Sequence, residues 1–293
     1  MRIRITRYTV LVLLLVLWMA WGPAGAEQTY DRGVLWSVTS PEGKTNYLLG
    51  TIHSSDPAVL NLGEPVRKAF ATSTRYVMEL IPDAEAITRM QSSMLYGADE
   101  QLKDALMPEL YGKVVRAMAK RGVPEAATAR MRPWTLLVTL NMPAENSGLI
   151  LDNLLYQQAM NAGKTLQGLE TVDEQLAVLT DWPREKIISW LEETVDNLDQ
   201  IESMLRDLMQ AWLDRDLARL QQIAMEMEFG DDADYEEFML RLVDQRNRRM
   251  VQRMVSSLDE GGAFVAIGAL HLPGKKGVLR LLHEQGYRLK ALY

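Results

Sequence analysis

The sequence predicts an α/β fold in which two similar β-GxxH-α-β halves form a mixed, largely parallel sheet, with a large helical layer inserted between them. Two short stretches carry this prediction, residues 47–53 (YLLGTIH) and residues 265–271 (VAIGALH). Each is an apolar run of strand length that ends in Gly, two small or apolar residues and His. Each precedes a helical pattern and a second strand-like run, and this order favours a parallel sheet.

The first half is expected to contain a hairpin, a helix and a third strand. The turn residues 40–43 (SPEG) join two strand-like runs and predict an antiparallel pair at the N-terminal edge of the sheet. Pro65 stands where a helix can begin. The expected elements are strands at residues 33–38, 46–49 and 75–80 and a helix at residues 64–72.

The middle of the chain is expected to be mostly helical. Apolar side chains recur every three or four residues between residues 184 and 227, which indicates one long amphipathic helix or a helical pair. We expect residues 100–260 to form a helical layer over the sheet, within a single domain that spans residues 27–293. The expected elements are helices within residues 100–162 (with breaks at 122–124 and 143–148), 184–227 and 234–258, a strand at 164–169, and a final helix and strand at 275–285 and 287–293.

The first 26 residues have the pattern of an export signal. A basic start is followed by an apolar run over residues 10–21 and by Ala-Gly-Ala at 24–26, so cleavage is expected before Glu27. The apolar run is shorter than the roughly 20 residues of a membrane-spanning helix, so stable membrane insertion is not expected. The chain has no cysteine, which excludes a disulfide framework and thiolate metal ligands. An exported chain without disulfides suggests a bacterial periplasm.

The charge of the chain argues against a general nucleic-acid binder. Removal of the signal removes three arginines and leaves 29 basic and 39 acidic residues, a formal charge of −10. A protein that neutralises nucleic-acid phosphates would need the opposite balance.

Only three histidines occur, and His53 and His271 hold matched positions after matched strands. If the two leading strands are neighbours, about 4.8 Å apart, both imidazoles reach one small site at the carboxyl ends of the strands. We expect metal binding or catalysis there, against the alternative of two structural histidines. The third, His283, lies near the end of a helix, where the helix dipole favours it, and a structural role is expected. Gly50 and Gly268 are expected to let backbone or ligand approach closely.

Glu79 ends the strand that follows the first GxxH stretch, on the same edge of the sheet as His53 and His271. A carboxylate in an otherwise buried strand needs a partner, which is either a metal ion or an arginine. Two histidines and one carboxylate are a suitable ligand set for a hydrolytic metal site. Zinc fits these ligands, and manganese and cobalt are also compatible. The histidines can bind metal only while neutral, so activity is expected to fall below about pH 6.

The chain also resembles a known family. The resemblance rests on the export signal, YLLGTIH, the carboxylate in VMEL (77–80), residues 147–171 (SGLILDNLLYQQAMNAGKTLQGLET) with EQL after them, QRNRRM (245–250) and residues 264–287. Together these motifs resemble the TraB/GumN family, which also includes the Tiki-type proteases. The resemblance covers nearly all of the mature chain and implies a metal-dependent peptidase-like fold.

The resemblance implies that His53, Glu79 and His271 form the site. Arg132 (in RMRPW), Glu170 (in GLET), Asn247 and Arg248 match other motif positions of the family. These four either orient the ligands and contact substrate or form ion pairs between helix and sheet. Similar members have been tied to control of signalling peptides and to export clusters, so catalysis does not follow for every member.

Two function classes are therefore predicted. The leading one is a periplasmic metallohydrolase that acts on a peptide or protein substrate, with a divalent ion held by His53 and His271 and with Glu79 as ligand or general base. The alternative is a non-enzymatic periplasmic binder that holds a peptide or a haem-like ligand on the same scaffold. Neither reading implies a particular oligomeric state.

Overall fold

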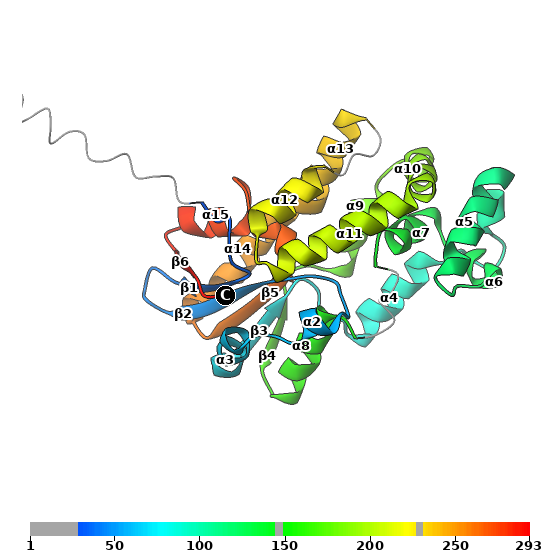
Figure 1. Cartoon of the computed structure of the whole chain (residues 1–293). Helices are drawn as coiled ribbons and strands as arrows, with labels where there is room; N and C mark the ends of the chain where they lie inside the picture. The colour runs from blue at the N-terminus through cyan, green and yellow to red at the C-terminus, as the bar shows by residue number, and fades with distance from the viewer. Residues whose placement is uncertain (1–28, 144–148, 227–230) are drawn as a thin grey trace, which may run out of the picture.

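The computed structural model describes residues 29–143, 149–226 and 231–293. The expected export signal, residues 1–26, lies outside these described residues. At the centre is one six-stranded sheet (Figure 1). Its strands are β1 (Leu35–Thr39), β2 (Thr45–Thr51), β3 (Arg75–Met78), β4 (Thr165–Gly168), β5 (Ala263–Gly268) and β6 (Arg288–Ala291). The strand order is β4-β3-β5-β2-β1-β6, in which β4, β3, β5 and β2 are parallel and β1 is antiparallel to both of its neighbours. The predicted mixed, largely parallel sheet is confirmed.

The two GxxH stretches form neighbouring parallel strands, as predicted. Strand β2 pairs with β5 so that Thr51 lies opposite Gly268. Strand β5 also pairs with β3, so the leading strand of the second half is inserted between the two strands of the first half. Because β2 and β3 occupy both sides of β5, the last strand β6 joins the sheet at a free edge, where it pairs with β1.

Helices cover both faces of the sheet and define where the site can form. Helices α2 (Pro57–Leu60), α3 (Glu64–Thr72) and α8 (Leu151–Asn161) lie on one side, and α12 (Leu217–Met225), α14 (Gln245–Glu260) and α15 (Val278–Glu284) on the other (Figure 1). The chain moves from β2 to β3 and β4 in one direction, and from β5 to β6 in the opposite direction. The connections after β2 and β5 therefore diverge to opposite faces, and ligands of open α/β sheets bind in the crevice at such a point.

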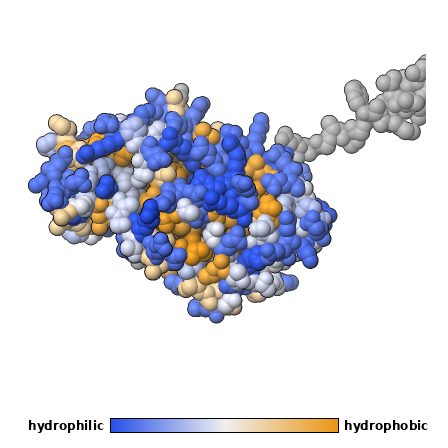
Figure 2. Space-filling model, turned by 180° about the vertical axis from the view of Figure 1, so that it is seen from behind, coloured by the Kyte–Doolittle hydropathy of each residue, from blue (hydrophilic) through white to orange (hydrophobic). Residues whose placement is uncertain are grey.

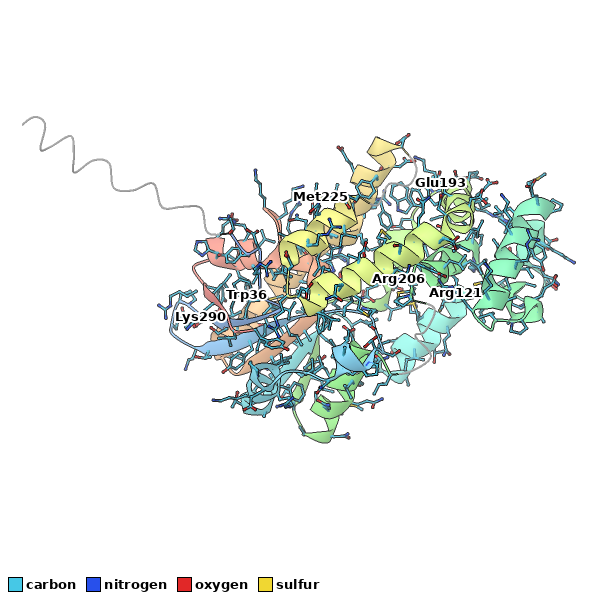
Figure 3. All side chains as sticks on the ribbon, in the orientation of Figure 1. Trp36, Arg121, Glu193, Arg206, Met225 and Lys290 are labelled. Carbon is cyan, nitrogen blue, oxygen red and sulfur yellow. The ribbon has the colours of Figure 1, made fainter. Side chains whose placement is uncertain are left out.

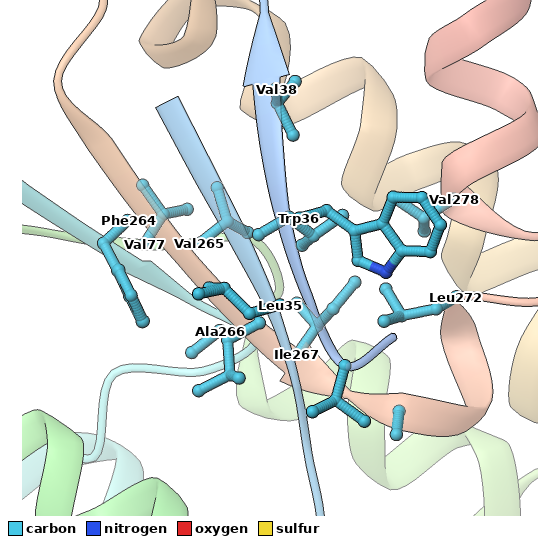
Figure 4. Close-up of a cluster of buried hydrophobic side chains, with 14 of the residues drawn as sticks. Leu35, Trp36, Val38, Val77, Phe264, Val265, Ala266, Ile267, Leu272 and Val278 are labelled. Carbon is cyan, nitrogen blue, oxygen red and sulfur yellow. The ribbon is translucent and has the colours of Figure 1, made fainter. Parts of the chain in front are cut away.

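Strand β5 is buried on both faces and forms the centre of the core. Its residues Phe264, Val265, Ala266 and Ile267 are all buried, which explains why the sequence reads as a continuous apolar run and not as an alternating one. Figure 4 shows these side chains beside those of the neighbouring strands. Trp36 lies in the same cluster, and its indole N–H donates to the carbonyl oxygen of Gly33 at 2.7 Å, so this buried N–H is satisfied.

The remaining helices extend the molecule beyond the sheet (Figure 1). Several of them pack around two further hydrophobic clusters, one centred on Leu136 and Leu191 and one on Trp182 and Trp190. Part of the expected helical layer therefore covers the sheet, and part of it packs around hydrophobic clusters of its own, away from the sheet. These remaining helices are α4 (Ala84–Met94), η1 (Leu102–Asp104), α5 (Pro108–Lys120), α6 (Glu125–Thr128), α7 (Pro133–Leu140), α9 (Val172–Thr180) and α10 (Arg184–Asp196).

The expectation of one long helix or a helical pair over residues 184–227 is wrong. The described part of this region forms three helices, α10, α11 (Leu198–Leu213) and α12, on which Glu193, Arg206 and Met225 are labelled in Figure 3. Asn197 separates the first two, and Arg215, with φ of 58°, turns the chain before the third. The spacing of apolar residues continues across both breaks, because each helix buries its own apolar face. The spacing therefore does not reveal where the chain turns.

The other expected breaks and helices are largely confirmed. Helix α5 ends before Gly122, which has φ of 77°. The expected break at residues 143–148 falls mostly outside the described residues. Residues 234–258 lie in a helical run that consists of α13 (Asp232–Met239), the π-helical turn η2 (Leu240–Asp244) and α14.

Gly50 lets the segment after β5 lie against β2, as the sequence suggested. A methyl group at Gly50 would meet the Cδ1 atom of Leu272 at 2.7 Å and the Cα atom of Ala269 at 3.0 Å. Gly50→Ala is therefore expected to lower the free energy of unfolding by about 1–3 kcal/mol, measured by urea unfolding. Gly97→Ala is the control, because nothing lies within 4 Å of a methyl group there. Equal stability of the two variants would contradict the close approach.

Within residues 29–143, 149–226 and 231–293, no helix has both the length and the apolar character needed to cross a bilayer. Figure 2 shows the face opposite to that of Figure 1, on which apolar patches are interrupted by hydrophilic residues.

Candidate functional site

Three neighbouring strands bring the predicted residues to one edge of the sheet. Strand β2 ends two residues before His53, β3 ends directly before Glu79, and β5 leads into the 3₁₀ turn η3 (Ala269–His271), which ends at His271. The strands are parallel and adjacent in the order β3-β5-β2, so their carboxyl ends coincide. His53, Glu79 and His271 line one cavity of about 470 Å³ there.

The imidazole of His271 is held in one orientation. Asn247 on α14 donates from Nδ2 to the carbonyl oxygen of Lys276 at 2.9 Å, so its Oδ1 is the atom that lies 2.7 Å from His271 Nδ1. An amide oxygen can only accept, which assigns the proton to Nδ1 and leaves a lone pair on Nε2 of the neutral ring. That Nε2 lies 3.7 Å from Oε1 of Glu79.

The carboxylate of Glu79 is fixed on both sides. Its Oε1 accepts the backbone N–H of Gly268 at 2.7 Å, and its Oε2 accepts from Arg246 Nη2 at 2.7 Å. A methyl group at Gly268 would lie 3.4 Å from Oε1, an ordinary contact, so the close approach expected at Gly268 is not found there. Of the two partners expected for Glu79, the arginine is therefore present as Arg246, and His271 lies beside the carboxylate.

Arg246 joins two carboxylates in the interior. Its guanidinium contacts Glu79 and both carboxylate oxygens of Glu170, at 2.7–3.1 Å. The Glu170 side chain is fully buried, and Gln175 also donates to it at 3.3 Å. A cation that lies between two carboxylates offsets part of the cost of burying them.

The electrostatics favour an ionised Glu79 beside a neutral His271. Burial opposes charge on Glu79, but His271 when protonated, Arg246 and the N–H of Gly268 more than offset it and lower its pKa to about 2. Burial lowers the pKa of His271 to about 4, against the opposing charge of Glu79. Protonation of His271 therefore cannot set the limit near pH 6 that the sequence suggested. The neutral ring is available as a metal ligand over most of the acidic range.

The lowered pKa of His271 gives stability a defined pH dependence. The unfolded chain binds a proton at this histidine below its ordinary pKa of 6.5, whereas the folded chain does so only near 4. The contribution of His271 to the free energy of unfolding is fully present above about pH 6.5. It falls by roughly 2–4 kcal/mol as the pH is lowered towards 4. Urea unfolding from pH 7 to 4 is expected to show a shallower loss for His271→Gln than for the exposed control His283→Gln. Parallel profiles for the two variants would contradict the assignment.

His53 lines the same cavity in a more open setting. Its side chain is 49% exposed, and its Nδ1 lies 3.6 Å from Oδ2 of Asp152.

The other predicted residues lie in three different settings. Glu170 and Asn247 contact the site through Arg246 and His271. Arg132 lies at the start of α7, donates to the carbonyl oxygen of Leu95 and covers the ring of Tyr96, and it does not line the cavity. Arg248 is exposed on α14.

Sequence reasoning missed Arg246, Gln175 and Asp152. Arg246 could have been found, because it lies four and eight residues before the buried Met250 and Met254 and so falls on the apolar stripe of α14. Gln175 and Asp152 gave no comparable signal, since their positions depend on contacts distant in sequence.

The residues fit a divalent metal ion in part. Among the residues that the structure describes, no group of three or more His, Asp or Glu side chains is arranged to hold an ion. Two ligands of a tetrahedral zinc ion lie roughly 3.3–3.6 Å apart. His271 Nε2 and Glu79 Oε1 lie 3.7 Å apart, just beyond that spacing, and both present lone pairs. Two candidate ligand atoms thus lie close together, and His53 lines the same cavity.

The arrangement defines a candidate metal centre at the carboxyl edge of an α/β sheet. The model of the TraB/PrgY/gumN family matches residues 34–291, and the chain therefore belongs to this family. The resemblance found in the sequence is confirmed.

Relatives with described activities are similar over most of the chain. Metalloprotease TIKI2 of Danio rerio is 26% identical over 314 residues, which cover 87% of this chain and 60% of the relative. Metalloprotease TIKI1 of Danio rerio and Metalloprotease TIKI2 of Xenopus tropicalis are each 24% identical, again over 87% of this chain. The chain spans about 60% of the length of these curated relatives. No solved structure matches the chain significantly.

Proposed function

We propose that this chain is a metal-dependent hydrolase of peptides or proteins, with His53, His271 and Glu79 as the residues that hold and serve a divalent ion. The observation that carries the proposal is the pair of facing lone pairs on His271 Nε2 and Glu79 Oε1. Two acceptors at 3.7 Å repel each other, and a cation between them would turn this repulsion into attraction. Zinc, manganese and cobalt are all compatible with nitrogen and carboxylate ligands.

The residues of the chain supply binding, orientation and proton transfer. When bound, the ion would polarise a peptide carbonyl group and acidify a water molecule. His53 and His271 would hold it through ring nitrogens, and Asn247 keeps Nε2 of His271 free for this purpose. Glu79 stays ionised and can accept a proton as general base or share in ligation. Arg246 holds the outer oxygen of Glu79 and so fixes the direction of the carboxylate.

A second cavity gives room for a peptide beyond the site. It has a volume of about 820 Å³ and shares Val138, Leu179 and Leu242 with the walls of the first cavity. Half of its lining residues are apolar, and the other half, which includes Asn197 and Gln200, are polar or charged. A bound peptide would meet both apolar contacts and hydrogen-bonding groups there.

The location follows from the first 26 residues. Their basic start, short apolar run and Ala-Gly-Ala end support export to a bacterial periplasm, with a mature chain that begins at Glu27. The substrates would then be peptides or proteins of that compartment.

Peptide turnover tests the proposed activity. The mature chain is incubated with zinc, manganese or cobalt and a mixture of peptides of varied sequence, and the products are identified by mass spectrometry. Cleavage that a chelator stops and added metal restores is the expected result. His53→Ala and His271→Ala should both remove it. Tight peptide or haem binding without cleavage under all three metals would contradict the proposal and favour the binder.

A further inference from the structure

Asp152 is attached to the loop that carries His53. It is the second residue of α8, and the preceding residue Leu151 donates its backbone N–H to the carbonyl oxygen of Ser54 at 3.1 Å. The Oδ1 atom of Asp152 accepts the hydroxyl proton of Thr51 at 2.6 Å. The start of α8 and the end of β2 therefore form one unit, which holds the carboxylate beside the imidazole.

The second carboxylate oxygen of Asp152 lacks a hydrogen bond. Oδ2 is buried and is one of four such side-chain atoms found unsatisfied within the described parts of the chain. Leaving a buried polar atom unpaired costs about 1–3 kcal/mol, so a donor within reach is expected to be used. The Nδ1 atom of His53 lies 3.6 Å away. A small movement of the half-exposed ring would bring it to the roughly 2.8 Å of a charge-assisted hydrogen bond.

The two histidines then have equivalent surroundings. Asn247 accepts the Nδ1 proton of His271, and Asp152 is placed to accept the Nδ1 proton of His53. Packing holds His271, whose side chain is only 7% exposed, whereas that of His53 is 49% exposed. His53 therefore depends more on a hydrogen bond for its orientation.

Tyr76 is the competing donor. Its hydroxyl is also buried and unsatisfied among the described residues. Burial and the charges of Asp152 and Glu79 raise the pKa of Tyr76, so it stays protonated and can donate. A test must separate a carboxylate held by Tyr76 from one that holds His53.

We propose that Asp152 is the positioning residue of His53: its Oδ2 accepts the Nδ1 proton of the imidazole and leaves the lone pair of Nε2 turned to the cavity. The inference deepens the proposed function, on which the use of that lone pair rests. Carboxylates that accept the outer N–H of a ligating histidine fix both its tautomer and its orientation.

Ring ¹⁵N NMR at pH 8 tests the tautomer directly, on the mature chain treated with chelator. Only three histidines contribute, and His53→Gln and His271→Gln assign them. Wild type is expected to show His53 with the proton on Nδ1. Asp152→Asn should move it to Nε2, because Thr51 engages the amide oxygen and the amide nitrogen then faces Nδ1 as a donor. Asp152→Ala should also move the His53 proton from Nδ1 to Nε2, because it removes the acceptor at Nδ1. It serves as the second variant if Asp152→Asn does not fold.

Two controls make the test specific. Asp173→Asn changes an acid at the same second position of another helix, α9, and should leave the tautomer of His53 unchanged. Tyr76→Phe should also leave it unchanged. A wild-type His53 with its proton on Nε2, an unchanged Nδ1 tautomer in both Asp152 variants, or a shift in Tyr76→Phe would each overturn the proposal.

Metal affinity gives the second readout. Calorimetric titration with Zn²⁺ or Mn²⁺ is expected to show about 10- to 100-fold weaker binding for Asp152→Asn and unchanged binding for Asp173→Asn. Equal affinities of Asp152→Asn and wild type would overturn the positioning role. If wild type binds none of the metals, the proposed function fails, whereas the tautomer measurement still decides the role of Asp152.

Discussion

Glu79→Gln is expected to lower peptide turnover by roughly 10²-fold or more, since the variant keeps the shape of the side chain and removes its charge. The fold should survive, because Arg246 keeps its hydrogen bonds to Glu170. Metal content separates the two roles of Glu79. Full metal with lost turnover identifies a general base, and a parallel loss of both identifies a ligand.

Glu174→Gln is the matched control for this variant. Glu174 is also paired with arginines, Arg249 and Arg253, and its pKa is also lowered to about 2, but it does not line the cavity. Its replacement should leave turnover unchanged. If Glu79→Gln retains full metal and full activity, Glu79 is structural and Glu170 becomes the next carboxylate to test.

Arg246→Met is expected to lower the free energy of unfolding by about 3–5 kcal/mol, because it leaves two buried carboxylates without their cation. The side chain of Glu170 is fully buried, and that of Glu79 is 18% exposed. Urea unfolding at pH 7 measures the effect. Adding Glu170→Gln to Arg246→Met should restore part of the loss, since one uncompensated charge is then removed.

The control for this prediction is Arg248→Met, two residues away on the exposed side of α14. It should change stability by no more than about 0.5 kcal/mol. Similar losses in the two variants would show that the Glu79–Arg246–Glu170 cluster does not carry the stability assigned to it.

The repeated GxxH stretches were enough to predict that their two strands are neighbours. Matched strands in a parallel sheet end at one edge, and the register of Thr51 with Gly268 confirms that the strands leading to His53 and His271 are paired. Glu79 was expected at the same edge from its place at the end of a buried strand, and it lines the same cavity as both histidines. The class of fold and the edge that carries the candidate site were therefore accessible from local patterns.

The contacts around the site were less accessible, because they join elements that are distant in sequence. Asp152 reaches Thr51 across 101 positions, and Arg246 reaches Glu79 across 167. The motif QRNRRM drew attention to Arg248, whereas the phase of the helix turns Arg246 inward and Arg248 outward. Arg132 matched a motif, but it holds Leu95 and Tyr96 instead of the site.

Metal analysis of the purified mature chain, beside His53→Ala and His271→Ala, tests the central claim most directly. After equilibration with zinc, manganese or cobalt and removal of free ions, wild type is expected to retain about one divalent ion per chain. Both variants are expected to lose it while they keep the far-UV circular dichroism of the folded protein. A wild-type chain that retains no ion under any of the three metals, or variants that retain as much as wild type, would contradict the metal centre.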